Sequence, residues 1–159
     1  MDPFEGHADR YRPLAGYATL IALFGALMTA FLAVAGRRDR LPGALGPADA
    51  ALLGTATFRL SRLMAKDRVT SVLRAPFTRF QEDSGEGEVE EAARGRGLRR
   101  AVGELLVCPV CLAQWTAGGL LALFTFAPRT ARTVSSLFVV VTVSDLLQMA
   151  YSRLKSAAG

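Results

Sequence analysis

Residues 105–127, LLVCPVCLAQWTAGGLLALFTFA, contain no charged side chain in 23 consecutive positions. A helix of that length is about 34 Å long, enough to cross the roughly 30 Å hydrocarbon core of a bilayer. The stretch therefore predicts a membrane-spanning helix, and this prediction decides the fold class. Near its start lie the only two cysteines of the chain, Cys108 and Cys111, which form a C-x-x-C pair.

The rest of the chain divides into apolar runs and charged blocks. Of the 159 residues, 51% are hydrophobic and 21% are charged, yet residues 14–36 contain no charge and residues 133–152 contain only Asp145. Such separation of charges from long apolar runs is typical of integral membrane proteins. These two runs predict a second and a third spanning helix.

Residues 48–66 leave two topologies open. Arg59, Arg62 and Lys66 fall on one face of a helix over this segment, and apolar side chains fall on another. If the helix spans, its arginines reach the cytoplasmic surface from the last turns, and the fold is an all-α membrane bundle of four spans. If it lies in the interface as an amphipathic helix, the bundle has three spans.

Polar segments complete the domain organisation. Residues 1–13 form an N-terminal tail, which holds the single histidine, His7, and residues 153–159 form a C-terminal tail. Residues 67–103 are expected to form a cytoplasmic loop. Within it, residues 81–97 are rich in Glu and Gly and poor in apolar side chains. That composition is typical of a flexible, solvated acidic linker.

Basic residues set the orientation. Seventeen of the 19 basic residues are arginines, and ten basic residues lie from Arg59 to Arg100. Because cytoplasmic loops of membrane proteins carry an excess of Lys and Arg, this central segment and the C-terminus are predicted to be cytoplasmic. The arginines are expected to contact anionic lipid headgroups. Nucleic acid is not an expected partner, because the chain has no basic platform interleaved with aromatic residues.

Several short motifs occur in one order along residues 48–151. They are residues 58–63 (FRLSRL), residues 67–70 (DRVT), Arg74, and residues 103–106 (GELL) leading to Cys108, Cys111 and Trp115. In these motifs the chain resembles an uncharacterised bacterial membrane family, domain of unknown function 1360, which includes small sporulation-associated proteins. The resemblance implies a family-like domain over residues 48–152 of a bacterial cytoplasmic membrane protein. It makes residues 14–36 an added N-terminal span, favours four spans, and implies no activity.

The cysteine pair leaves three interpretations open. Pro109 suits the first position of a helix, which places Cys108 near the N-cap, where the helix dipole favours its thiolate. Arg99 and Arg100 are close in sequence and act in the same direction. The pair can be small buried thiols at a helix interface, a zinc site that two chains complete with four thiolates, or a thiol–disulfide redox pair. The redox interpretation lacks a surrounding βαβ pattern, and the cytoplasm keeps structural disulfides reduced.

Asp145 is a lone carboxylate within the last apolar run. Ionisable groups in lipid are costly and are usually paired. We expect Asp145 to form an ion pair with Arg59 or Arg62, either of which reaches a similar depth if residues 48–66 span. The alternative is a proton or ion pathway, which a single intramembrane carboxylate supports poorly.

The remaining candidate residues concern packing and the cytoplasmic face. Trp115 is too deep for an interfacial aromatic belt, and we expect it to pack between helices near Gly118 and Gly119. The charged residues expected on the cytoplasmic face are Asp67, Arg74, Arg99 and Arg100.

No Ser/His/Asp set, phosphate-binding loop or carboxylate dyad is present in the sequence. We therefore interpret the protein as a non-enzymatic membrane protein with a structural or assembly role, as a homo-oligomer or as a subunit of a membrane complex. The alternative is a membrane thiol-redox or zinc-binding protein that uses the pair Cys108 and Cys111.

Overall fold

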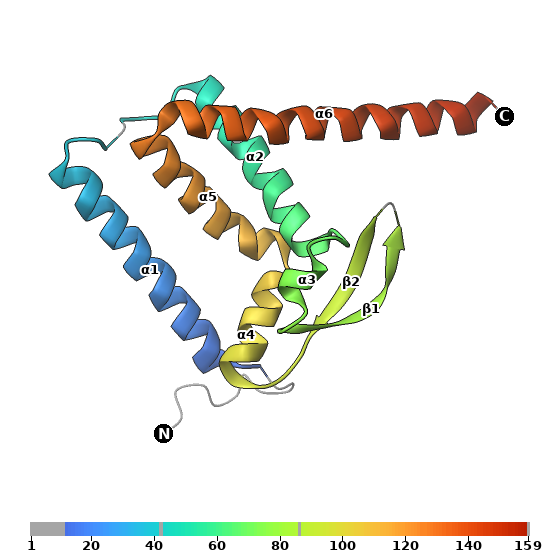
Figure 1. Ribbon diagram of the computed structural model, residues 1–159, viewed down its shortest axis with the longest axis horizontal. Helices are drawn as coiled ribbons and strands as arrows, with labels where there is room; N and C mark the ends of the chain where they lie inside the picture. Colours follow the sequence, from blue (N-terminus) through green and yellow to red (C-terminus); the bar gives the residue numbers. More distant parts are fainter. Residues whose placement is uncertain (1–11, 42, 86, 159) are drawn as a thin grey trace.

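The computed structural model describes residues 12–41, 43–85 and 87–158. Helix α5 (Pro109–Phe126) lies between α1 (Leu14–Arg37) and α2 (Pro47–Lys66), and α6 (Pro128–Ala158) runs from the end of α5 across α2 (Figure 1). The short helix α3 (Ser71–Arg74), the strands β1 (Thr78–Gly85) and β2 (Glu88–Ala93), and α4 (Gly97–Leu106) lie at the opposite end of α2 and α5. The C-terminal half of α6 extends beyond the other helices.

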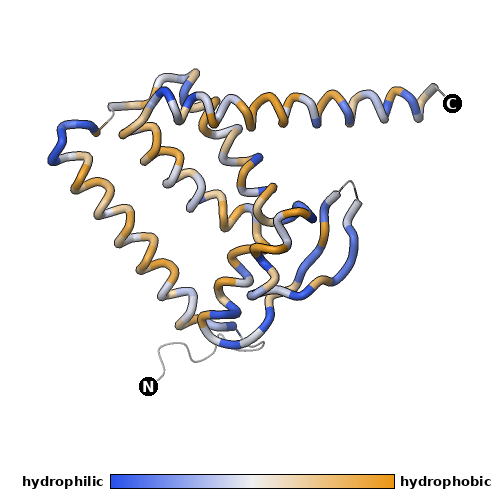
Figure 2. The backbone as a smooth tube through the Cα atoms, in the orientation of Figure 1, coloured by the Kyte–Doolittle hydropathy of each residue, from blue (hydrophilic) through white to orange (hydrophobic). Residues whose placement is uncertain are grey.

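Among the residues that the structure describes, three helices are long and apolar enough to cross a membrane by length and composition. They are Leu14–Arg37, Pro109–Phe126 and Pro128–Ala157. Figure 2 shows hydrophobic residues along most of α1, α5 and the middle of α6, and hydrophilic ones on the hairpin of β1 and β2. The chain is thus mostly helical, with the character of a membrane protein, as the sequence predicts. Helix α2 is not among the three.

The hairpin corrects the expectation that residues 81–97 form a flexible linker within an all-α fold. Strands β1 and β2 pair antiparallel, with Thr78 opposite Ala93 and Gly85 opposite Glu88. Val89 is 2% exposed, and the three glutamates of β2 have basic partners on α2 and α3. The composition of this segment alone indicates a solvated loop, because the basic partners of its glutamates lie elsewhere in the sequence.

The predicted span over residues 105–127 is found as a candidate span in α5, but its first two residues belong to α4. Helix α4 ends at Leu106 and α5 begins at Pro109. Proline has no N–H to donate to the preceding turn, but it suits the first position of a new helix. Cys108 is the N-cap of α5, which confirms the position predicted from Pro109.

Small and apolar side chains hold α2, α5 and α6 together. Leu53 and Ala56 on α2 form a buried cluster with Leu120 on α5, against which Leu45, Phe124 and Phe138 pack. Contiguous apolar contacts of this kind form the core of the bundle.

Helix α1 packs on α5 through aromatic contacts and on α4 through a glycine. The rings of Phe24 and Trp115 are 5.2 Å apart in an edge-to-face arrangement. A Cβ built at Gly118 would lie 3.0 Å from Met28 Cε, and one at Gly16 would lie 2.7 Å from the Cβ of Ala101. Gly16 therefore allows a close approach of α1 to α4. Of the two glycines expected beside Trp115, Gly118 faces α1, whereas Gly119 has open space around it.

Candidate functional site

Arg74 is a charged residue buried where α2, α3 and the hairpin meet. Its side chain is 1% exposed and that of its partner Glu91 is 5% exposed. The guanidinium Nε and Nη2 each lie 3.1 Å from a different carboxylate oxygen of Glu91. Ser71 Oγ and Thr78 Oγ1 also donate to this carboxylate, each at 2.6 Å. The buried negative charge is thus compensated by four hydrogen bonds.

These contacts set the protonation of Glu91. Burial alone raises the pKa of Glu91, but the hydrogen bonds from Arg74, Ser71 and Thr78, together with the charge of Arg74, outweigh burial. The pKa of Glu91 consequently lies below its ordinary value of 4.5, so the carboxylate is ionised at neutral pH.

The remaining donors of Arg74 close the end of α2. Nη1 donates to the carbonyl of Met64 at 2.8 Å and to Thr70 Oγ1 at 2.6 Å, and Nη2 donates to the carbonyl of Asp67 at 3.0 Å. The last carbonyls of a helix lack partners within the helix, so Arg74 acts as a C-terminal cap. With every nitrogen of its guanidinium engaged, Arg74 organises structure and has no free nitrogen for a ligand.

Asp67 and Arg74, both expected on the cytoplasmic face, meet without an ion pair between their side chains. Asp67 meets Arg74 through its backbone carbonyl, while its carboxylate accepts from the N–H of Val69 at 2.8 Å. Arg59 lies on α2 and pairs with α6 instead. Glu91 was not predicted from the sequence, because its segment has the composition of a linker. Its position three residues after Glu88 in a β strand carries no signal of its own.

Three further ion pairs fasten the hairpin to α2 and its C-terminal extension. Arg62 donates to both carboxylate oxygens of Glu88 at 2.7 Å. Lys66 pairs with Glu90 at 2.7 Å, and Arg68 with Asp83 at 2.8 Å. Together with Arg74 and Glu91 they make one charged junction, called here the charged platform.

A wedge-shaped pocket of about 820 Å³ lies between α2, the hairpin and α6. Across it, Arg59 Nη1 lies 3.1 Å from Asp145 Oδ2, with side chains 21% and 38% exposed. The structure thus brings together Asp145 and one of the two arginines expected near it, while Arg62 binds the hairpin. Apolar side chains of Phe58, Leu146 and Met149 share the lining.

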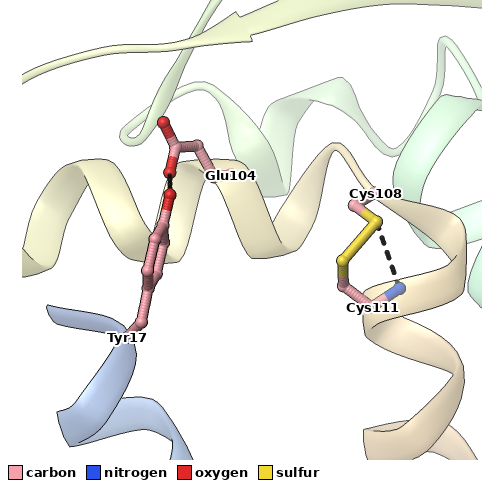
Figure 3. The surroundings of a disulfide bond; sticks show 4 residues. All are labelled: Tyr17, Glu104, Cys108 and Cys111. Carbon is pink, nitrogen blue, oxygen red and sulfur yellow. Dashed lines mark hydrogen bonds between the residues drawn. A yellow bond between two sulfur atoms is a disulfide. The ribbon is translucent and has the colours of Figure 1, made fainter. Parts of the chain in front are cut away.

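Cys108 and Cys111 are joined by a disulfide (Figure 3). The backbone N–H of Cys111 donates to Cys108 Sγ at 3.2 Å. Cys111 is exposed, Val110 is 80% exposed, and Cys108 is half-buried. The pair is therefore an accessible disulfide, which differs from the interpretation as buried free thiols.

The assignment of these cysteines as metal ligands shared between two chains stays a prediction, and it requires the disulfide to be reduced. Zinc binds thiolates, and sulfurs joined to one another are not thiolates. Within residues 12–41, 43–85 and 87–158, no group of three or more His, Cys, Asp or Glu side chains is arranged to hold a metal ion. His7 lies outside the residues that the structure describes.

Helix α4 joins the disulfide to α1 and to the charged platform. Glu104 accepts a hydrogen bond from the hydroxyl of Tyr17 and pairs with Arg100 at 2.9 Å. In Figure 3, Glu104 points toward Tyr17 and away from the sulfurs. Arg99 donates to the carbonyl of Pro76 at 2.6 Å. Both arginines expected near Cys108 thus have partners on α4 or on the turn after α3; the sequence analysis missed the contact with Tyr17.

A family model described as Protein of unknown function (DUF1360) matches residues 52–151, which begin inside α2 and end inside α6. A relative from Bacillus subtilis (strain 168), described as Sporulation protein YjcA, is 30% identical over 105 residues, or 64% of this chain and 89% of the relative. No solved structure matches. The matched region contains the platform, the wedge and the disulfide but not α1.

Proposed function

This chain belongs to the DUF1360 family of proteins of unknown function, and we propose that it is a multi-pass protein of the bacterial cytoplasmic membrane with a structural or assembly role. In this proposal the protein acts as a homo-oligomer that self-associates through α6. The description of the B. subtilis relative as a sporulation protein supports placing this role in sporulation.

Helix α2 is proposed as the fourth span. Polar groups in lipid need partners within the protein, and those of α2 have them. Thr57 Oγ1 donates to the carbonyl of Leu53 at 2.8 Å, Ser61 Oγ donates to the carbonyl of Phe58 at 3.0 Å, and Arg59 pairs with Asp145. With polar groups paired and small residues against α5 and α6, α2 tolerates lower hydropathy than a lone span.

The orientation follows from the basic residues around the platform. Segments near the ends of spanning helices with an excess of Lys and Arg stay in the cytoplasm, and acidic neighbours contribute little to this bias. The charged platform and the C-terminus are therefore proposed to be cytoplasmic. Exposed arginines such as Arg79 and Arg96 are proposed to contact anionic lipid headgroups.

The observation that carries self-association is a polar line on α6. Ser144, Gln148 and Ser152 recur every fourth residue in the C-terminal half of α6, and all three are exposed, with Gln148 Nε2 donating to Ser144 Oγ at 3.3 Å. Neighbouring apolar side chains are exposed as well, including Leu147 at 65%. In lipid, Ser and Gln side chains bind across helix interfaces, because hydrocarbon offers them no partner. A second copy in the same orientation places Gln148 opposite its own counterpart, so the line is self-complementary.

Cysteine cross-linking in native membranes tests this interface. In a chain with Cys108→Ser and Cys111→Ser, Ser144→Cys should form a covalent dimer on mild oxidation. The matched control is Val143→Cys, which lies at the same depth but on another face of α6. The proposal expects efficient dimers for Ser144→Cys and few for Val143→Cys. Equal yields, or no dimer from Ser144→Cys, would contradict it.

The second candidate function is thiol–disulfide exchange at Cys108 and Cys111. The observation in its favour is an exposed disulfide at a helix N-cap, on the side proposed to be cytoplasmic. Disulfides that form in the cytoplasm are usually transient and catalytic or redox-sensing. A shared zinc site would require all four sulfurs to be reduced, so the disulfide favours exchange over zinc. Purified oxidised protein should oxidise a two-cysteine peptide one for one; an unchanged peptide would argue against exchange.

A further inference from the structure

We infer that Cys111 is the sulfur attacked by an incoming thiolate, that Cys108 is the leaving thiolate, and that the substrate is a polypeptide dithiol at the membrane surface. This inference rests on the second proposed function, thiol–disulfide exchange, and adds to it a direction of attack and a class of substrate.

Access distinguishes the two sulfurs. Attack on a disulfide requires the incoming thiolate to reach one sulfur in line with the bond that breaks. Cys111 is exposed, whereas Cys108 is half-buried at the junction between α4 and α5. Val110, between them, is 80% exposed. A partner therefore reaches Cys111 more readily than Cys108.

The electrostatics of the helix start act in the same direction. Cys108 is the N-cap of an 18-residue helix, and its Sγ accepts the N–H of Cys111 at 3.2 Å. The positive end of the helix dipole and this N–H both stabilise negative charge on Cys108. A sulfur that is stabilised as a thiolate leaves faster. Exposure favours attack on Cys111, and the helix start favours departure of Cys108.

The exchange balances without any other reactant. One thiolate of the substrate attacks Cys111 Sγ, a mixed disulfide forms, and Cys108 leaves with the electron pair of the broken bond. The second thiol of the substrate loses its proton to water and attacks the substrate sulfur of the mixed disulfide, and Cys111 leaves as a thiolate. Both thiolates of the chain take protons from water. One dithiol is oxidised by two electrons, and one disulfide is reduced by two.

The surroundings indicate the class of dithiol. The exposed side chain next to the attacked sulfur is apolar, Val110, and the disulfide begins a helix that is a candidate span. An apolar contact at that place suits a polypeptide segment at the membrane–water boundary better than a small hydrophilic thiol. Val110→Asp should therefore slow oxidation of an apolar two-cysteine peptide more than that of a hydrophilic one, whereas Gln114→Asp, at an exposed position one turn from Val110, should not discriminate between them.

Mass spectrometry of a trapped intermediate tests the direction of attack. The oxidised full-length chain in detergent micelles is exposed briefly to reduced glutathione, and free thiols are then blocked with N-ethylmaleimide. Tandem spectra locate each adduct. We expect glutathione on Cys111 and N-ethylmaleimide on Cys108 in excess over the reverse by about fivefold or more, since thiolate stabilisation at a helix start is worth up to roughly tenfold. Oxidation of the two-cysteine peptide is measured in parallel.

The outcomes separate the inference from the function beneath it. Excess glutathione on Cys111, with oxidation of the peptide, supports both. Glutathione equally on both sulfurs, or mainly on Cys108, with oxidation of the peptide, overturns the direction of attack and leaves exchange standing. An intact disulfide with neither adduct nor peptide oxidation overturns exchange and the inference together.

Discussion

Arg74 joins three pieces of the chain that are separate in sequence. It caps α2, binds the side chains of Thr70 and Ser71, and pairs with Glu91 of β2. Such a buried pair stabilises little in total, because desolvation offsets much of the attraction. Its effect is specific: removal of one partner leaves an uncompensated charge, so the platform forms in one arrangement only.

Arg74→Ala should destabilise the protein strongly, by about 3–5 kcal/mol, because Glu91 would stay buried without its cation. The matched control is Arg68→Ala, whose pair with Asp83 has side chains 58% and 62% exposed; exposed pairs of this kind contribute about 0–1 kcal/mol. Unfolding by SDS in mixed micelles measures both. Similar losses for the two variants would show that Arg74 is not a buried anchor.

Glu91 gives the platform a dependence on pH. Its pKa in the folded protein lies below the ordinary value of 4.5. The folded state therefore takes up this proton at a lower pH than the unfolded state does. The contribution of Glu91 is therefore complete above that ordinary value and is lost as pH falls through the lowered folded pKa. The stability difference between the wild type and Glu91→Gln should be constant at neutral pH and shrink in acid. A difference that grows as the pH falls would reverse the sign of this assignment.

Single residues were predictable from sequence where the signal is local or chemical. Pro109 is enough to place Cys108 at an N-cap, and a lone Asp145 in an apolar run calls for a nearby arginine, which the structure supplies in Arg59. Glu91 was not predictable, because its partner Arg74 lies 17 residues earlier and nothing local distinguishes it from Glu90. Neither was the oxidised state of the cysteines, since spacing allows thiols, metal or disulfide equally.

At the scale of elements, the hydropathy of the sequence does not show where α4 ends and α5 begins. Hydropathy averages across Pro109 and therefore joined the end of α4 to α5. Charge composition likewise hid β1 and β2, whose pairing depends on distant cations. By contrast, the bounds of α1 and α2 were predictable to within one residue, because charged or Pro-containing segments flank them. Helix α6 extends about five residues beyond the predicted apolar run at each end, because its charged ends are helical too.

Gly103→Ala tests the contact of α4 with the hairpin. A Cβ at this position would lie 2.5 Å from the carbonyl oxygen of Phe77 and 2.9 Å from the Cβ of Ala93, so the backbone has to move. The matched control is Gly119→Ala on α5, where nothing lies within 4 Å and alanine should favour the helix by up to about 1 kcal/mol. Thermal unfolding should show a loss for the first variant and no loss for the second. Equal tolerance would mean that α4 does not touch the hairpin.

The ion pair across the wedge is testable as a coupling between α2 and α6. Asp145→Asn and Arg59→Gln should each destabilise the bundle, and the double variant should lose less than the sum of the two. We expect a coupling of roughly 0.5–3 kcal/mol, as for contacting charged residues in general. Additive losses, or an Asp145→Asn variant with unchanged folding and assembly, would show that the contact at 3.1 Å does not hold the helices together.

At the scale of the whole molecule, ion pairs at the two ends of α2 are proposed to lie at the two membrane surfaces. On the proposed outer side, Arg132 of α6 donates two hydrogen bonds to the carboxylate of Asp49 at the start of α2. On the proposed cytoplasmic side, the platform gathers Arg62, Lys66 and Arg74 with the glutamates of the hairpin. Both ends of α2 are thus fastened to neighbouring elements, which supports the proposal that α2 is a fourth span.

Labelling from outside the cell tests this topology most directly. In a chain with both native cysteines replaced by serine, Ala44→Cys marks the connection between α1 and α2, and Ser84→Cys marks the hairpin. A membrane-impermeant maleimide applied to intact cells should label Ala44→Cys and leave Ser84→Cys unlabelled until the cells are lysed. Label on Ser84→Cys in intact cells would show that the topology is inverted. An unlabelled Ala44→Cys would show that α2 does not cross the membrane.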